Sequence, residues 1–380
     1  MSGKIKKVFP GGNTSRGFYS YYDYMLEKGT NRIFVIKGGP GVGKSTLMKK
    51  IGNKMVELGY NTEFHYCSSD NNSLDGIVIS QLGIVMVDGT APHIVDPKYP
   101  GGVDEIINMG EFWDTEKMEE NKEKIIASTT EVGRLFAKAY RFFAAARLIA
   151  ENITLVHIQI RENYGVVNEK KLLEKNIFSE LGESKILGNK RHLFGSAYTP
   201  EGLVDLAESI LGEIGKVYFV EGELGAGKSE LLEKIAELAI EKGSDVEIYH
   251  TPLIPEKIET IIIEKIGVGI TVSKKFEDIC YQKINLNKYL NRSILATYNE
   301  ELSIDKELMD SLIQKGIEFI KKAKLEHDVL ENYYVPNMDF KKTEDIYEYI
   351  IDKILSYTSG KLIVDLGKGV IHDIDTEHIE

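Results

Sequence analysis

The chain has 380 residues, a length that suggests two or three domains. Its net charge of −12 argues against broad, nonspecific binding of nucleic acid, although a local basic groove stays open. We find no apolar run long enough to span a bilayer and no signal peptide, so we expect a cytoplasmic protein without a membrane partner. The two cysteines, Cys67 and Cys280, suit a reducing compartment and lack the spacing of metal ligands.

A strand is predicted at residues 32–36, which are apolar and rich in β-branched and aromatic side chains. The glycine-rich stretch behind it fits G-x-x-x-x-G-K-[ST], the pattern of loops that bind the phosphates of nucleoside triphosphates. It consists of Gly38, Gly39, Pro40, Gly41, Val42, Gly43, Lys44 and Ser45. Apolar residues then recur at helical spacing from Leu47 to Leu58, and Gly59 follows where a helix end favours positive φ.

The order of strand, loop and helix gives these residues a chemical role. Backbone N–H groups of the loop and the helix N-terminus hold phosphate oxygens. Lys44 can reach the β- and γ-phosphates as a catalytic residue, Ser45 can ligate Mg²⁺, and Thr46 completes the nucleotide-binding set. The predicted cofactors are therefore ATP and Mg²⁺.

The next elements predict a second metal ligand. A strand is expected at 62–67, a short helix at 74–81 and a buried strand at 83–88 that ends in Asp88. An apolar strand ending in Asp is typical of the Walker B position, so we expect Asp88 to bind Mg²⁺ and to be catalytic; a turn-forming Asp-Gly is the alternative. Gly89 stands where many P-loop ATPases have a Glu that polarises the attacking water. Small-molecule kinases and GTPases lack that Glu, so the chain is more similar to them at this position. Neither D-x-x-G nor N-K-x-D is present in a convincing form, which disfavours a GTPase.

Three further residues are candidates in the first half of the chain. Asp70 follows the second strand and is predicted to be a general base or substrate ligand, with a helix cap as the alternative. Arg141 lies with Arg134 and Lys138 on one stripe of a helix predicted at 129–152. This stripe is either a lid that closes on phosphates or a solvated face. For His93 a surface or structural role is favoured over contact with the γ-phosphate.

The second half repeats the first at an offset of 184 positions (228 − 44). A predicted strand at 216–220 precedes a second loop, a helix follows it, and Gly243 matches Gly59. The second predicted nucleotide-binding set is Gly222, Glu223, Leu224, Gly225, Ala226, Gly227, Lys228, Ser229 and Glu230, with Ser229 as a metal ligand. Because one long period indicates duplication, we predict domains at residues 1–185 and 186–380.

The two copies differ where chemistry is expected. Val272 stands at the position of Asp88, and Glu230 at that of Thr46. We therefore expect the second site to bind nucleotide but to turn it over poorly. Two copies that pack as a pair would let one supply an arginine or lysine to the other's phosphate. Glu326, Asp328 and Glu331, late in the second copy, either complete a different site or solvate their helix.

The two loops, the stretch from Ile84 to His93 and the segment Tyr99-Pro100-Gly101-Gly102 resemble the tandem P-loop ATP-binding proteins of low-GC Gram-positive bacteria. This resemblance covers nearly the whole chain and implies ATP binding with an ATPase or nucleotide-kinase-like activity. The expected fold is α/β, with two doubly wound P-loop NTPase domains and mainly parallel sheets. Three functions stay open: phosphate transfer to a small molecule, an ATP-driven switch acting on a protein partner, and a nucleotide sensor. The sequence leaves the acceptor and the oligomeric state undetermined.

Overall fold

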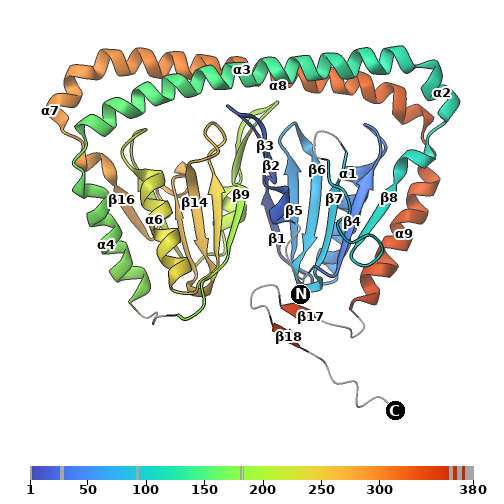
Figure 1. Ribbon diagram of the computed structural model, residues 1–380, viewed down its shortest axis with the longest axis horizontal. Coiled ribbons are helices and arrows are strands. Elements are labelled where there is room, and N and C mark those ends of the chain that lie inside the picture. Colours follow the sequence, from blue (N-terminus) through green and yellow to red (C-terminus); the bar gives the residue numbers. More distant parts are fainter. Residues whose placement is uncertain are drawn as a thin grey trace. The chain divides into compact units, whose positions relative to one another are not determined.

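The computed structural model describes residues 2–25, 30–90, 94–179, 182, 184–358, 363–365 and 370–372. The chain forms two compact units. Unit 1 comprises Met1–Pro10, Tyr22–Leu135 and Lys322–Glu380, and unit 2 comprises Gly11–Tyr21 and Phe136–Lys321. Each unit contains one six-stranded sheet (Figure 1).

The sheet of unit 1 has the strand order β1-β5-β6-β7-β4-β8. Its strands are β1 (Ile5–Val8), β4 (Arg32–Lys37), β5 (Thr62–Cys67), β6 (Asp70–Ile79), β7 (Ile84–Asp88) and β8 (Asp104–Asn108). All neighbours pair in parallel except β6, which runs antiparallel to both β5 and β7. The α/β class is thus confirmed, with a mixed sheet whose strands are mostly parallel.

The prediction of a short helix at 74–81 was wrong, because these residues belong largely to strand β6. Residues Leu74–Ile79 are buried without interruption, and the run Ile77-Val78-Ile79 is β-branched. A short, continuously buried run of this kind has no helical or alternating period, so periodicity alone does not identify it. The extra strand returns the chain so that β7 still lies parallel to β4.

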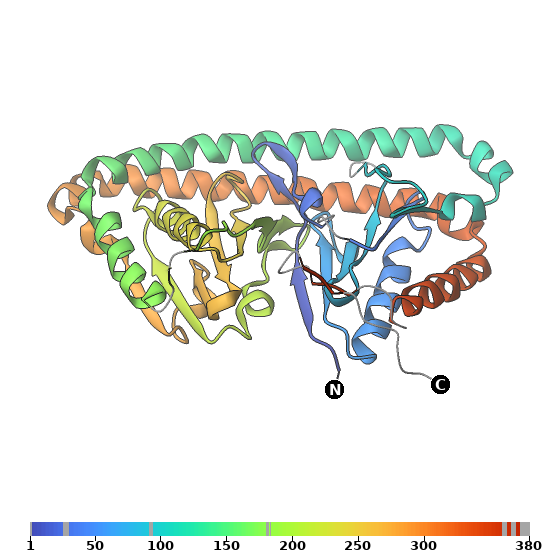
Figure 2. The ribbon, with the colours of Figure 1, turned by 60° about the horizontal axis from the view of Figure 1, so that its bottom comes forward.

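Helix α1 (Lys44–Glu57) begins directly after the first glycine loop. It packs with α9 (Phe340–Ser356) and the sheet in one apolar core (Figure 2). Its inward residues Leu47, Met48, Ile51 and Met55 are almost fully buried, whereas Leu58 is exposed. Gly59 follows the helix with φ 97°, as predicted. The smaller elements of unit 1 are η1 (Tyr22–Tyr24), η2 (Ser80–Leu82), η3 (Met109–Phe112), α2 (Thr115–Glu120), η8 (Val335–Asn337), β17 (Ile363–Asp365) and β18 (Val370–His372).

The sheet of unit 2 has the order β16-β12-β15-β14-β13-β9. Its strands are β9 (Lys190–Phe194), β12 (Lys216–Glu221), β13 (Val246–His250), β14 (Ile258–Ile263), β15 (Val268–Thr271) and β16 (Gln282–Asn285). Here β14 is the antiparallel member, pairing with β13 and β15. Gly243 adopts φ 71° after helix α6 (Lys228–Glu241), as predicted.

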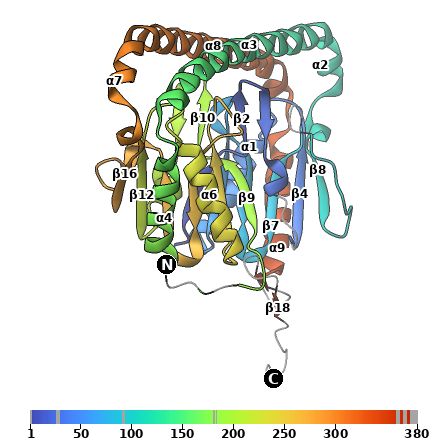
Figure 3. The same cartoon turned by 60° about the vertical axis from the view of Figure 1, so that its left-hand side comes forward.

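Helix α4 (Tyr164–Phe178) lies beside α6 and shares its apolar core (Figure 3). Two hairpins complete the strands of this unit: β2 (Gly11–Thr14) with β3 (Gly17–Ser20), and β10 (Ser196–Thr199) with β11 (Gly202–Asp205). The remaining short elements are α5 (Ala207–Leu211), η4 (Glu264–Ile266), η5 (Lys274–Phe276), η6 (Leu286–Tyr289), α7 (Arg292–Leu295) and η7 (Ala296–Tyr298).

Two long helices, α3 (Lys122–Ile160) and α8 (Asn299–Tyr334), each contribute residues to both units. The helix predicted at 129–152 lies within α3. Its residues Ala139, Phe143 and Ala146 are fully buried. In the part of the chain that the structure describes, no helix has the length and apolar character needed to cross a bilayer.

The compact units do not coincide with the predicted division between residues 185 and 186. Helix α4 precedes that division, yet Leu173 and Phe178 are buried in the core of unit 2. Helix α9 follows it, yet Ile350 and Ile354 are buried in the core of unit 1. Each core is thus completed by an apolar helix face from the other half of the chain.

The structural equivalence of the two halves changes offset along the chain. Gly83 and Gly267, 184 positions apart, both adopt the left-handed conformation, with φ 58° and 61°. The antiparallel bridge Trp113–Met338 in unit 1 corresponds to Leu290–Arg161 in unit 2, which gives an offset of 177 (290 − 113). The change falls between β7 and β8, where the first half has the longer connection.

Candidate functional site

The first glycine loop joins the carboxyl end of β4 to the N-terminus of α1. Gly41 and Gly43 have φ 67° and 91°, values that only glycine adopts readily. The Lys44 ammonium donates hydrogen bonds to the carbonyl oxygens of Gly38 and Gly39, both at 2.8 Å. The lysine side chain therefore folds back along the loop, with 11% of its surface exposed.

Asp88 lies beside this loop because β7 pairs with β4, with Asp88 opposite Ile36. Its carboxylate oxygen Oδ2 is 3.6 Å from Lys44 Nζ. The other oxygen accepts a hydrogen bond from Thr90 N–H at 2.9 Å, and the Thr90 hydroxyl donates to Gly38 O at 3.0 Å. The structure thus brings together two of the predicted catalytic residues, Lys44 and Asp88.

Ser45 is held by the neighbouring strand. Its Oγ accepts a hydrogen bond from the backbone N–H of Leu74 at 2.9 Å, which leaves the hydroxyl hydrogen and one lone pair for other partners. A serine hydroxyl and an aspartate carboxylate are oxygen donors of the kind that Mg²⁺ prefers. The residues present therefore fit the predicted ion, which Ser45 and Asp88 would hold.

Asp70 lies at the tip of the β5–β6 hairpin. Its carboxylate accepts hydrogen bonds from Asn72 N–H at 3.0 Å and the Ser73 hydroxyl at 2.9 Å, and Lys324 Nζ is 3.4 Å away. Burial raises the pKa of Asp70, but the Asn72 hydrogen bond and the charge of Lys324 outweigh it and lower the pKa overall. A carboxylate with a lowered pKa is a weak general base, so this environment favours the predicted role of substrate ligand. No helix follows Asp70, so the alternative role of helix cap is excluded.

Residues near the end of α8 line the first loop, and sequence reasoning could not assign them to it. A Cβ placed on Gly41 would lie 3.4 Å from Glu331 Cβ and 2.7 Å from Val335 Cγ2, and one on Gly39 would meet the Tyr334 ring. His327 Nδ1 is 3.6 Å from Glu331 Oε1, and Lys324 forms a hydrogen bond with Asp328 as well as its ion pair with Asp70. A polar cluster from the second half of the chain therefore adjoins the first loop.

Arg141 and His93 gain no support as site residues. Arg141 is an exposed residue of α3 in unit 2, whereas Lys44, Asp88 and Asp70 belong to unit 1. Its predicted companions have other roles: Arg134 pairs with Glu131, and the Lys138 ammonium lies 4.6 Å from the centroid of the Phe319 ring. His93 lies outside the described residues.

The second glycine loop repeats the geometry of the first between β12 and α6. Gly225 and Gly227 have φ 86° and 106°. Lys228 Nζ donates to Gly222 O, and Ser229 Oγ accepts from Ile258 N–H at 2.8 Å, as Ser45 does from Leu74. Burial lowers the pKa of Lys228. The positive charges of Lys257 and Lys274 lower it further, whereas the negative charge of Glu223 opposes this shift.

The carboxylate side of the second loop differs from that of the first. Val272 follows Thr271, which pairs with Phe219, and so holds the register position of Asp88. Asp205 adjoins this strand end and accepts a hydrogen bond from the Ser273 hydroxyl at 2.6 Å. Glu230, predicted to bind nucleotide, forms ion pairs with Arg161 at 2.8 Å and Lys234 at 2.7 Å.

Arg161, at the end of α3, is a residue that the motif search missed. Its guanidinium donates to Gly225 O at 3.4 Å, and a Cβ placed on Gly227 would lie 2.8 Å from Arg161 Nη1. An arginine from the first half of the chain thus lies against the loop of the second half, and both belong to unit 2. Comparison of the two halves could not have revealed Arg161, because the equivalent residue at the structural offset of 177 (338 − 161) is Met338 and not a second arginine.

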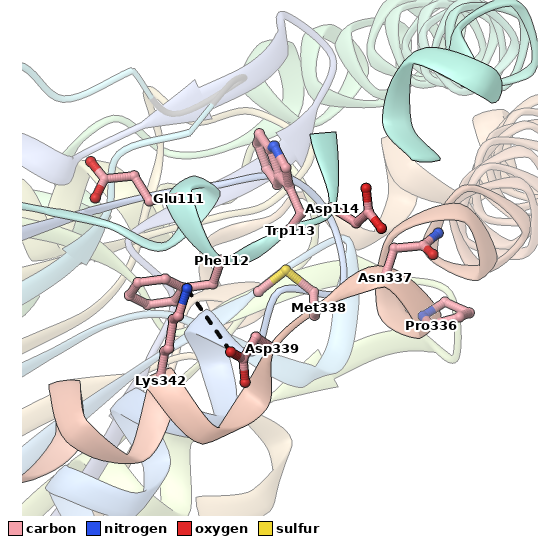
Figure 4. A pocket seen from close by; sticks show the side chains of 9 residues that line it. All are labelled: Glu111, Phe112, Trp113, Asp114, Pro336, Asn337, Met338, Asp339 and Lys342. Atoms are coloured by element: carbon pink, nitrogen blue, oxygen red, sulfur yellow. Dashed lines mark ion pairs between the residues drawn. The ribbon is translucent and has the colours of Figure 1, made fainter. Parts of the chain in front are cut away.

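Unit 1 also has a surface pocket of about 370 Å³ where the segment from η3 to α2 meets that from η8 to α9 (Figure 4). It is lined by Glu111, Phe112, Trp113, Asp114, Pro336, Asn337, Met338, Asp339 and Lys342. Lys342 Nζ is 3.9 Å from Asp339 Oδ2, and the Trp113 ring packs edge-on against Tyr334, with the centroids 5.8 Å apart. The pocket therefore neighbours the aromatic residue that contacts the first loop.

Comparison with known proteins found no family model, no curated protein and no solved structure that matches this chain. The resemblance to tandem P-loop proteins therefore stays a prediction that rests on the motifs.

Proposed function

We propose that this protein binds ATP with Mg²⁺ and hydrolyses it or transfers its γ-phosphate, mainly at the first glycine loop. The observation that carries the proposal is the convergence of Lys44, Asp88 and Ser45 at the N-terminus of α1. A lysine on a glycine loop, a helix N-terminus, a carboxylate and a hydroxyl are the parts that phosphoryl transfer requires.

The proposed binding step follows from the contacts of the loop. Backbone N–H groups would hold the phosphate chain, and Lys44 would exchange the Gly38 and Gly39 carbonyls for β- and γ-phosphate oxygens. Ser45 and Asp88 would hold Mg²⁺, which supplies charge neutralisation on those oxygens when bound. Movement of Lys44 away from Asp88 would leave that carboxylate free to act as a ligand.

The nucleophile would approach from the side of α8. Gly89 gives no carboxylate after Asp88, but Glu331 lies against Gly41 with His327 beside it. Asp70 and Lys324 extend this polar surface and would contact an acceptor. This surface supports phosphate transfer to a small molecule as readily as attack by water.

The second loop would bind nucleotide in a regulatory role. It repeats the lysine and serine contacts of the first, and its strand end lacks a carboxylate at the position of Asp88. Phosphate binding does not require that carboxylate, whereas placement of the metal for transfer does.

The test is incubation of the protein with γ-labelled ATP, Mg²⁺ and a panel of nucleosides, nucleotides and cofactors. Label on one acceptor establishes a phosphotransferase. Phosphate release without an acceptor establishes an ATPase, the activity that an ATP-driven switch needs. Binding with neither product contradicts the proposed turnover and leaves the sensor.

A further inference from the structure

Lys274 stands close to where the first half of the chain has its metal-binding carboxylate. Val272-Ser273-Lys274 corresponds at the offset of 184 to Asp88-Gly89-Thr90. In the first half, the Thr90 hydroxyl reaches the loop carbonyl of Gly38 at 3.0 Å. Lys274 is exposed, and its charge contributes to the lowered pKa of Lys228. A cation thus replaces the neutral residue next to the missing acid.

Lys257 stands beside the other predicted metal ligand. It directly precedes Ile258, whose backbone N–H donates to Ser229 Oγ at 2.8 Å. The corresponding residue before Leu74 is Ser73, which bonds to Asp70. Among the described residues, neither Lys257 nor Lys274 forms an ion pair or a side-chain hydrogen bond, although Glu151 and Glu256 attract Lys257 and Glu277 attracts Lys274 over longer distances. Both ammonium groups are therefore available to pair with an anion.

The carboxylates around the second loop are already engaged. Glu223 pairs with Lys306 at 3.0 Å, and Glu230 pairs with Arg161 and Lys234. Asp205 accepts hydrogen bonds from the Ser273 hydroxyl and from Ala207 N–H. Besides Lys228, which Glu223 attracts, the second loop therefore has two lysines, Lys257 and Lys274, that form no ion pair with these acids.

We infer that the second loop binds the triphosphate of a nucleotide without a divalent cation, with Lys257 and Lys274 supplying the positive charge that Mg²⁺ supplies at the first loop. This inference rests on the proposed function, since it takes the second loop to be a nucleotide site. It assigns the two loops different ligands: metal-bound nucleotide at the first and metal-free nucleotide at the second. Lysine ammonium groups neutralise phosphate charge but do not position a metal for phosphate transfer. This site would therefore bind the nucleotide without turning it over.

The test measures ATP binding by calorimetry in the full chain carrying Lys44→Ala, which leaves only the second loop intact. We expect the affinity in EDTA to equal that in Mg²⁺ within about threefold. Adding Lys257→Gln or Lys274→Gln is expected to weaken binding in EDTA about tenfold each, the loss of one charge-assisted hydrogen bond. Lys275→Gln is the matched control, because Lys275 is already paired with Glu208 at 2.9 Å, and should bind as the parent does.

Binding in the Lys44→Ala chain that requires Mg²⁺ would overturn the inference, above all if Asp205→Asn then abolished it. Absence of binding in either buffer would overturn it too, as would unchanged affinity in both lysine variants. The Lys228→Ala chain tests the proposed function separately, because only the first loop is intact in it. Mg²⁺-dependent binding there supports the proposed function whatever the second loop does. Thermal unfolding of each variant checks that it is folded.

Discussion

Glu259 is a partly buried carboxyl group in unit 2 whose pKa lies above its ordinary value. Removal from water raises its pKa to about 8, and Asp205 adds to this rise while hydrogen bonds from Ser196 oppose it. Since the folded pKa exceeds the ordinary value of 4.5, the unfolded state loses its proton first as the pH rises. Stability from this group is therefore complete below about pH 4.5 and is lost as the pH rises towards 8, by up to about 1.4 kcal/mol per pH unit.

Glu259→Gln replaces the protonated carboxyl with a neutral amide of the same shape. We expect this change to raise the free energy of unfolding at pH 8 by about 1–3 kcal/mol and to leave it nearly unchanged at pH 5, after allowance for solvent access. Urea unfolding at the two pH values measures the difference. Glu256→Gln, at an exposed carboxylate, is the control, and an equal effect at both pH values would contradict the assignment.

The residues of the candidate site can be predicted from sequence where they lie in one local motif. Lys44 and Ser45 follow from eight consecutive residues, and Asp88 from the strand that carries it. Glu331 and Arg161 could not be found this way. Each lies against a loop in the other half of the chain, and its position depends on how far α8 or α3 extends.

At the scale of elements, glycines in the two long helices should respond in opposite ways to substitution. Gly133 of α3 has no atom within 4 Å of a Cβ placed on it, so Gly133→Ala is expected to stabilise the protein by about 0.5–1 kcal/mol. A Cβ on Gly316 of α8 would lie 2.4 Å from Phe143 Cε1, and Phe143 is fully buried. Gly316→Ala is therefore expected to destabilise by about 1–3 kcal/mol. Thermal unfolding measures both, and equal signs would contradict the close approach of α8 to Phe143.

The predicted elements were most accurate where the chain has a clear period or punctuation. Strands β4, β5, β7 and β12 begin and end within a residue or two of the predicted bounds. Strand β6 was not predicted, because its buried run has no hydrophobic period. Since this strand is antiparallel to both of its neighbours, the sheet is mixed. The hairpin connection Ser68-Ser69 is hard to recognise in the sequence, because further polar residues follow it directly.

At the scale of the whole molecule, α4 from the first half and α9 from the second half each complete the core of the other half. We therefore predict that neither half of the chain folds alone. A fragment of residues 1–185 would expose the apolar face of α4, including Leu173 and Phe178, and one of 186–380 would expose that of α9. Burial of each such side chain contributes about 1.5–3 kcal/mol. We expect each fragment to aggregate or bind a hydrophobic dye, and the two to form a 1:1 complex when refolded together. Two monomeric fragments with cooperative unfolding and no association would contradict this.

The two loops should contribute unequally to Mg²⁺-dependent ATP turnover, and two matched variants measure the contribution of each. Lys44→Ala and Lys228→Ala remove the same ammonium group from the two loops, each of which holds it against loop carbonyls. We expect Lys44→Ala to lower turnover by at least about a hundredfold, because it removes a group that stabilises transferred charge. Lys228→Ala should retain most of the activity. Equal losses in both variants would contradict the account.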